Sequence, residues 1–250
     1  MSIFDKFLRI RELGIFSIII IVVITASIID SRFLTIDSWR AVFLAIPLIL
    51  VMAMGQMMVI ICRHVDISIG SILAFAAITI GFVFIHYPET SLLMALLITA
   101  SVGTVMGLVN GIIVTRFNVH SIIVTLGTLS LYRGLVFIVS GGRQIDRNDI
   151  PVHIISFSQT SFLFSIPAIL ILSVIIVLIT HLIMRHSVLG REIYATGSNP
   201  EAAHLKGINV TKVTLFCFGV CGMLAGVAGL FYASRFGYVN PGVTGVGIEF

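Results

Sequence analysis

Long runs of residues without a charged side chain constrain this chain more than any other feature. Residues 162–184 contain no Asp, Glu, Lys or Arg, and neither do residues 213–234. A helix needs about 20 apolar residues to cross a bilayer, so each run is long enough to do so. The whole chain is 58% hydrophobic and only 10% charged, whereas a soluble domain carries roughly 25% charged residues. The sequence therefore predicts a protein that crosses the lipid bilayer several times.

Seven segments have the length and composition of membrane spans. We therefore expect an all-α, polytopic membrane helix bundle that forms a single transmembrane domain over residues 1–250. The first segment follows Lys6 and Arg9 and lacks a clean small-residue cleavage site, so we interpret it as a retained anchor helix rather than a signal peptide. The expected spans are 10–29, 40–62, 67–86, 91–115, 118–139, 162–184 and 213–235.

The basic residues predict the orientation of these spans. With the N-terminus inside, nine Lys and Arg residues fall in cytoplasmic segments and five in outer segments. The positive-inside rule favours this arrangement, which puts residues 185–212 in the cytoplasm and residues 140–161 outside. The Lys and Arg residues at the ends of the spans thus account for the formal net charge of +4. It does not indicate a nucleic-acid partner, and the bilayer itself is the expected environment.

Residues 185–212 form a polar, basic segment between two apolar spans. Asn199 and Pro200 suit the N-cap and first turn of a helix, and Gly207 suits its C-terminal end. We therefore expect a short helix on the cytoplasmic face, of the kind a cytoplasmic partner pushes on. The candidate contact residues are Asn199, Pro200, Glu201, Ala202, Ala203, Lys206 and Gly207.

Glycines recur every fourth residue in the fourth expected span, at Gly103, Gly107 and Gly111. They put a flat face on the helix, against which another helix can pack closely. The partner is either a helix of the same chain or a second subunit, and the spacing does not decide between them. The seventh span repeats the theme with Gly219, Gly222, Gly226 and Gly229, where we expect helix packing.

A few polar side chains lie in or beside the apolar spans. Asp66 and Ser68 either cap the third span or line a solute path, because irregular backbone is tolerated near the membrane where it lines a cavity. Arg133 is costly in lipid unless it is paired or hydrated, although it could also reach the interface. Gln56 and Asn110 are either interhelical hydrogen-bond partners or solute ligands. The candidates for a translocation path are Gln56, Asp66, Ser68, Asn110, Thr125, Thr128 and Arg133.

The sequence lacks the motifs of the common catalytic sites. It contains no phosphate-binding Gly-x-x-x-x-Gly-Lys-Ser/Thr loop, no His-Glu-x-x-His and no Gly-x-Ser-x-Gly. We expect Cys62, Cys217 and Cys221 to be packing residues, and we predict no catalytic residue, metal or cofactor. Two alternatives to a driven transporter remain: a membrane-embedded enzyme that uses His64 and Asp66, and a passive channel.

Three motifs together resemble a known family. They are Asp66-Ile-Ser-Ile-Gly-Ser71, the segment Thr125-Leu-Gly-Thr-Leu-Ser-Leu-Tyr-Arg-Gly134, and the segment from Leu189-Gly-Arg-Glu to Leu205-Lys-Gly-Ile208. In this order they resemble the membrane permease subunits of bacterial ATP-binding-cassette sugar importers. The ribose-type permeases are similar, with the rhamnose and autoinducer-2 permeases as close relatives. The resemblance covers essentially the whole chain.

This resemblance implies a pore-forming subunit of the bacterial inner membrane that is not itself an enzyme. It would form the path with a second permease subunit, identical or related. Cytoplasmic ATPase subunits would drive it, and a periplasmic solute-binding protein would deliver a sugar of the ribose, rhamnose or autoinducer-2 class. Residues 199–207 would be the helix that couples the permease to its ATPase. The family continues past Glu249 with further spans, so the resemblance also implies that the domain is incomplete at its C-terminal end.

Overall fold

The structure is a computed structural model that describes residues 11–162 and 166–248. Lys6 and Arg9 of the basic N-terminus lie outside the described residues, as do residues 163–165 of the sixth expected span. Contacts within the chain divide it into two units, one ending at Phe43 and one beginning at Leu44. Each unit is described by itself.

The first unit contains helix α2 (Arg11–Ile29), the 3-10 turn η1 (Ser31–Leu34) and the first residues of α3 (Ile36–Ile61). Asp30 caps η1, because its side chain accepts a hydrogen bond from the Arg32 backbone N–H at 2.9 Å. The apolar part of α2 spans Leu13–Ile29 and leaves most of its large side chains exposed. This pattern is typical of a helix surrounded by lipid.

The second unit is built almost entirely of helices. Six helices among the described residues are long and apolar enough to cross a membrane, and α2 adds a shorter apolar one. The all-α class with about seven spans is therefore confirmed. The elements after α3 are α4 (Ile69–His86), α5 (Leu92–Phe117), α6 (Ser121–Ser140), η2 (Arg147–Asp149), α7 (Val152–Gln159), β1 (Ser161–Phe162), β2 (Ile166–Pro167), α8 (Ala168–His186), α9 (Val188–Ser198), α10 (Pro200–Leu205) and α11 (Val210–Phe236).

Helix α8 begins later than the sequence predicted. The apolar run starts at residue 162, but Ser161–Phe162 pairs with Ile166–Pro167 in a short antiparallel hairpin, and the helix starts at Ala168. Pro167 has an extended backbone and occupies the N-cap position. Apolar character alone therefore misplaced this boundary by about six residues, because a proline-terminated hairpin can be as apolar as a helix.

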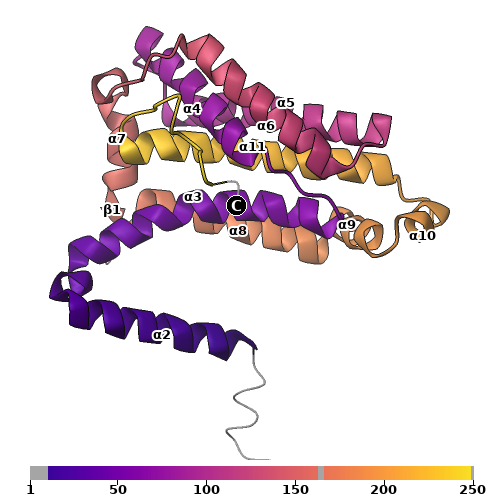
Figure 1. The fold of residues 1–250 in the computed structure, drawn as a ribbon, viewed down its shortest axis with the longest axis horizontal. Helices are drawn as coiled ribbons and strands as arrows, with labels where there is room; N and C mark the ends of the chain where they lie inside the picture. Colours follow the sequence, from indigo (N-terminus) through magenta and orange to yellow (C-terminus); the bar gives the residue numbers. More distant parts are fainter. Residues whose placement is uncertain (1–10, 163–165, 249–250) are drawn as a thin grey trace, which may run out of the picture. The chain divides into compact units, whose positions relative to one another are not determined.

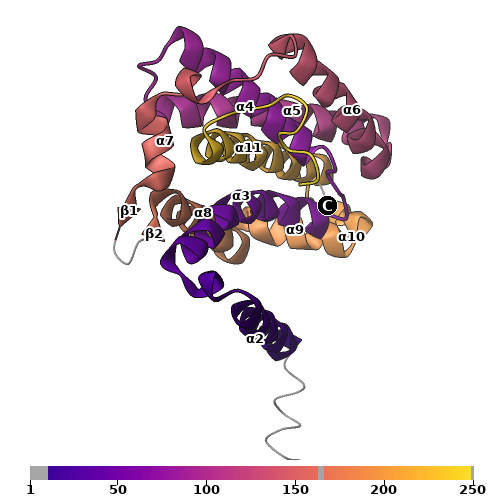
Figure 2. The ribbon, with the colours of Figure 1, turned by 60° about the vertical axis from the view of Figure 1, so that its left-hand side comes forward.

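Helix α11 forms the centre of the second unit. It runs between the group α4, α5 and α6 on one side and helices α3 and α8 on the other (Figure 1, Figure 2). It packs most extensively against α5. A β-carbon at Gly103 would overlap the carbonyl oxygen of Gly222, and one at Gly107 would overlap that of Phe218. The glycine face of α5 is therefore occupied by α11 of the same chain, which decides the question left open by the spacing.

The ends of the helices gather at two poles of the second unit. At the first, which we call the inner pole, the link after α3 meets the start of α6, where the Val65 N–H donates to Ser121 Oγ at 3.1 Å. At the second, the outer pole, Ile145 pairs with Val239 in an antiparallel bridge. The inner pole carries the ends predicted to be cytoplasmic, including those with Arg63 and Arg116.

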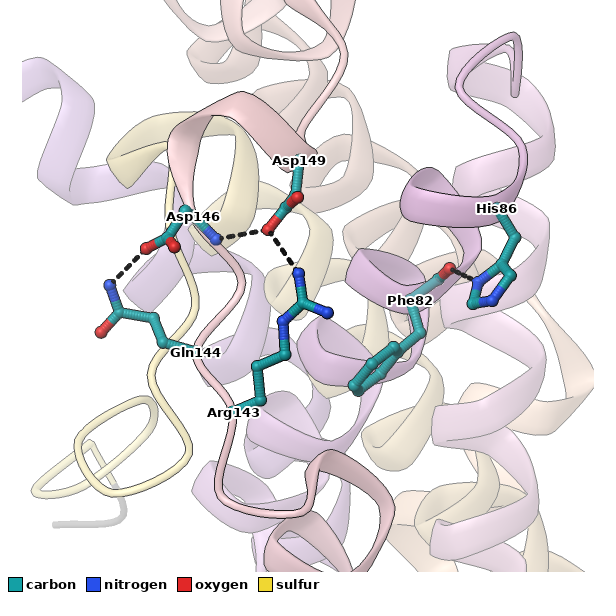
Figure 3. A network of polar contacts seen from close by, with 6 residues as sticks. All are labelled: Phe82, His86, Arg143, Gln144, Asp146 and Asp149. Carbon is teal, nitrogen blue, oxygen red and sulfur yellow. Dashed lines mark hydrogen bonds and ion pairs between the residues drawn. The ribbon is translucent and has the colours of Figure 1, made fainter.

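The outer pole is more ordered than the turn-rich loop expected at residues 140–161. Figure 3 shows its polar network, in which Arg143 Nη2 lies 3.7 Å from Asp149 Oδ2. The Asp146 N–H donates to the same carboxylate at 3.0 Å, and Gln144 Nε2 donates to Asp146 Oδ1 at 3.0 Å. Asn240 Nδ2 donates to Gln144 Oε1 at 2.8 Å. The loop is thereby tied to the segment that follows α11.

Candidate coupling and translocation site

The short helix predicted at the cytoplasmic face is present as α10. Asn199 is its N-cap, with the side chain accepting a hydrogen bond from the Ala202 N–H at 3.1 Å, and Pro200 occupies the first turn. Glu201 lies in the same turn, where a carboxylate interacts favourably with the helix N-terminus. Gly207 follows with φ +85, a left-handed conformation that glycine adopts without strain. The helix and its caps are confirmed, and its coupling role stays a prediction.

The exposure of α10 shows which of its residues a partner could reach. Ala203 is 3% exposed and packs within the chain, so it does not belong to the outer face on which we expected it. Glu201 and Lys206 are exposed, and Leu205 is 87% exposed. A single exposed leucine is common on protein surfaces, so its exposure shows only that a partner could reach it. Sequence analysis did not select Leu205.

Helix α9 was not predicted. Ser187 caps it by accepting a hydrogen bond from the Gly190 N–H at 3.0 Å, and the helix buries Gly190, Ile193 and Thr196. A signal for it exists in the sequence, since these three residues recur at the i, i+3, i+6 spacing of one helical face. The polar residues between them made the segment resemble a loop.

Helix α9 docks against the end of α3 at the inner pole. Arg63 adopts φ +66, and its Nη2 donates to the Ser198 carbonyl at 2.6 Å. A β-carbon at Gly197 would overlap the Ile61 carbonyl oxygen, so the two backbones are in direct contact. Ser198 immediately precedes Asn199, the N-cap of α10. The hydrogen bond from Arg63 to Ser198 therefore connects the end of α3 almost directly to α10. We call Ile61, Arg63, Gly197 and Ser198 the coupling junction.

Four polar side chains meet in the core just beyond this junction. Asp66 Oδ1 accepts hydrogen bonds from the Ser68 N–H at 2.9 Å and from Ser68 Oγ at 2.6 Å. Asn110 Nδ2 donates to Ser68 Oγ at 2.8 Å and lies 3.3 Å from Asp66 Oδ2. The Tyr132 hydroxyl donates to the Met106 carbonyl at 2.9 Å and contacts Asn110 Oδ1 at 3.3 Å. We call Asp66, Ser68, Asn110 and Tyr132 the polar node.

The polar node is closed to solvent, because its members are between 0% and 4% exposed. Its hydrogen bonds join the α3–α4 link to α5 and α6. Thr125 lies nearby, with its hydroxyl 3.4 Å from the Val65 carbonyl, and Thr128 bonds back to the Thr125 carbonyl at 3.3 Å. The structure thus brings Asp66, Ser68, Asn110 and Thr125 together, and their part in a translocation path stays a prediction.

Gln56 and Arg133 lie apart from the polar node. Gln56 Oε1 accepts a hydrogen bond from Cys221 Sγ at 3.7 Å. Arg133 Nη1 donates to the carbonyl of Thr244, in the segment that follows α11. Arg133 is half-buried and bonded to this carbonyl, so it ties that segment to α6.

Comparison with known proteins identifies the family. Residues 39–250 match the family described as branched-chain amino acid transport system / permease component. The chain belongs to this permease family. It is 34% identical over 222 residues to the autoinducer 2 import system permease protein LsrC of Yersinia pseudotuberculosis serotype O:3 (strain YPIII), covering 89% of this chain and 62% of that protein. The LsrC of Yersinia enterocolitica serotype O:8 / biotype 1B is also 34% identical over 222 residues, which cover 89% of this chain and 60% of that protein.

No solved structure matches the chain. The permease spans somewhat less than two thirds of the length of these relatives. The expected resemblance to import permeases is confirmed, and the apolar helices agree with it. The chain is a multi-pass protein of the bacterial inner membrane.

The enzyme alternative finds no support at His64 and Asp66 of the permease. Asp66 is fully buried and its carboxylate is occupied by the polar node. His64 packs on the Phe218 ring, with centroids 5.8 Å apart, and burial together with nearby His120 lowers the pKa of its imidazole. The part of the chain that the structure describes contains no cluster of three His, Cys, Asp or Glu side chains suited to a metal.

Proposed function

We propose that this chain is the membrane-spanning permease subunit of an ATP-binding-cassette importer, and that it moves a sugar or sugar-like solute inward. ATP hydrolysis belongs to a separate cytoplasmic subunit, which binds the exposed side of α10. A periplasmic binding protein delivers the solute at the outer pole, and a second permease subunit, identical or related, completes the path. The names of the family and of its import permeases support this assignment.

The observation that carries the proposal is the coupling junction. A displacement of α10 must move Ser198, which is bonded to Arg63 through a short charge-assisted hydrogen bond. It must also move Gly197, whose backbone abuts the end of α3 with no side chain between them. Both contacts lead into the α3–α4 link, and that link ends in the polar node. A push on α10 therefore reaches the membrane core through the backbone contact at Gly197 and the short hydrogen bond of Arg63.

A passive channel would not need this arrangement. Its solute moves down a gradient, so no cytoplasmic helix has to be held rigidly against the spans. The driven permease explains the coupling junction.

The central test replaces residues 201–206 by a Gly/Ser linker in cells that also express the ATPase and the binding protein. We expect normal membrane insertion, because the spans are untouched, and loss of uptake of labelled ribose, rhamnose and autoinducer 2. The ATPase should no longer co-purify with the permease, or should hydrolyse ATP without moving solute. Uptake at the normal rate by the linker variant would refute the proposal.

The junction can be tested by one small substitution. Gly197→Val puts a side chain into the Ile61 carbonyl, so the contact has to open. We expect ATP hydrolysis to continue while uptake falls at least tenfold, a cost of about 1.4 kcal/mol in coupling. Gly134→Val is the matched control, since a β-carbon at Gly134 meets nothing within 4 Å. Equal uptake by the two variants would show that the junction does not transmit the motion.

A further inference from the structure

A cavity of about 510 Å³ lies between α3 and α11. Its volume is within the range of small-molecule sites, which is roughly 300–1,000 Å³. It extends from Arg235 and Phe236, at the outer end of α11, to Ile69 at the start of α4. The cavity thus begins on the side from which an imported solute arrives and ends beside Ser68 of the polar node.

The polar groups of the cavity are few and specific. Gln56 contributes a carboxamide from α3, and Arg235 contributes a guanidinium from α11. The guanidinium carbon lies 4.7 Å from the centre of the Phe236 ring, and that ring lies 4.5 Å from the Tyr232 ring, centre to centre. No Asp or Glu is among the described lining residues, and Arg235 has no carboxylate partner within the described part of the chain.

We propose that this cavity is the site at which the permease contacts its solute, and that it selects a small, uncharged, hydroxyl-rich molecule of the sugar class. This inference rests on the proposed function. The guanidinium and the carboxamide donate hydrogen bonds to hydroxyl and ring oxygens, and the aromatic rings pack against the C–H face of a sugar ring.

The same lining disfavours an aliphatic amino acid, although the family description names this class. Arg235 could pair with the carboxylate of leucine. The ammonium group would then find no carboxylate among the described lining residues, and a buried, unpaired charge is strongly unfavourable.

The position of the cavity connects it to the coupling junction. Ile69 lines it and directly follows Ser68, which the polar node holds in place. A shift of the α3–α4 link would therefore move the inner end of the cavity. Solute binding and coupling to the ATPase both involve the α3–α4 link. A push on α10 can therefore change the affinity of the cavity for its solute.

The experiment measures access to the cavity and does not depend on the ATPase. Ala53→Cys places a thiol in the lining, and Leu178→Cys, half exposed on α8 and outside this cavity, is the control. The native cysteines are buried. The purified full chain in proteoliposomes is treated with a charged, membrane-impermeant thiol reagent, alone or with ribose, rhamnose, autoinducer 2 or leucine. We expect the thiol of the Ala53→Cys variant to be labelled about tenfold faster than that of the control, since a thiol must meet water to react.

At least one of the three sugar-class compounds should slow this labelling, leucine should not, and Arg235→Gln in the same background should remove the protection. Labelling no faster than the control would mean that lipid or another protein segment fills the cavity, which overturns the inference. Protection by leucine alone, or protection unaffected by Arg235→Gln, would overturn it too. If the Gly/Ser linker variant of α10 still abolishes uptake in that case, the proposed function stands and only the solute site is wrong.

Discussion

The two sides of helix α11 differ in how they meet their neighbours. Toward α5, the backbones touch through Gly103, Gly107 and Gly222, and there is no room for a methyl group. Toward α3, the helix makes one comparably close contact, where Gly55 abuts Cys221, and farther along it borders the cavity. The α5–α11 pair is thus built as a fixed unit, and α3 is the helix with space to move. A transporter needs both, because a solute path opens only if one wall shifts against another.

The largest expected effect comes from disrupting the close contact between α5 and α11. Gly107→Leu would drive a side chain into the Phe218 carbonyl, so α5 and α11 would have to separate. Overpacking of this kind costs about 3 kcal/mol or more. We expect little monodisperse protein after detergent extraction. Gly127→Leu is the matched control because its β-carbon has open space around it, and equal yields of the two variants would contradict a tight α5–α11 contact.

The next effect concerns the polar node, which bonds the α3–α4 link to α5 and α6. Asp66→Ala leaves the Ser68 N–H and hydroxyl without their acceptor. Each buried polar group left unpaired costs roughly 1–3 kcal/mol. The midpoint of thermal unfolding in detergent should fall clearly for Asp66→Ala. It should fall less for Asp66→Asn, because that variant keeps one acceptor oxygen. An unchanged midpoint for Asp66→Ala would show that the node is hydrated rather than closed.

A smaller effect is expected at Arg133, which holds the segment after α11. Arg133→Leu removes the hydrogen bond to the Thr244 carbonyl, and a bond to a charged donor contributes about 1.5–3 kcal/mol. We expect normal insertion and yield, faster proteolysis within residues 237–248, and reduced uptake. If uptake is normal and cleavage unchanged, Arg133 has no part in transport.

The smallest effect on stability is expected on the side of α11 that faces α3 and borders the cavity. Ala53→Leu fills part of the cavity without meeting tightly packed backbone, so its unfolding midpoint should stay close to that of the native protein. Uptake should nevertheless fall, because the solute site is narrowed. A large loss of stability would show that α3 is packed as tightly as α5, and the contrast between the two sides of α11 would disappear.

The sequence predicted most of the helices because length and apolar character alone define a membrane span. It predicted α10 because the caps of a short helix are local signals, as at Asn199 and Gly207. It could not predict which apolar faces meet, since side chains toward lipid and toward protein are equally apolar. Val51 is buried and Ile49 is 61% exposed, yet nothing in the local sequence separates them.

The polar residues show a second limit of the sequence. Asp66 and Asn110 are 44 residues apart, and their contact depends on how α4 and α5 pack. Sequence analysis therefore selected both residues and could not tell that they bond to each other. Arg235 was counted only as an outer charge, because it comes to line the same cavity as Gln56 only when α11 lies against α3.

The short length of α4 has a consequence for how the protein is made. Its 18 residues extend about 27 Å, less than the hydrocarbon core of about 30 Å, and its polar start bonds to Asn110 of a later helix. During synthesis α4 leaves the ribosome before this partner exists, and its buried face also waits for α11. We therefore expect α4 to depend on the membrane insertion machinery or a chaperone in the interval. Degradation of unassembled chains, rather than slow transport, is the first phenotype to expect from substitutions that delay the packing of α11.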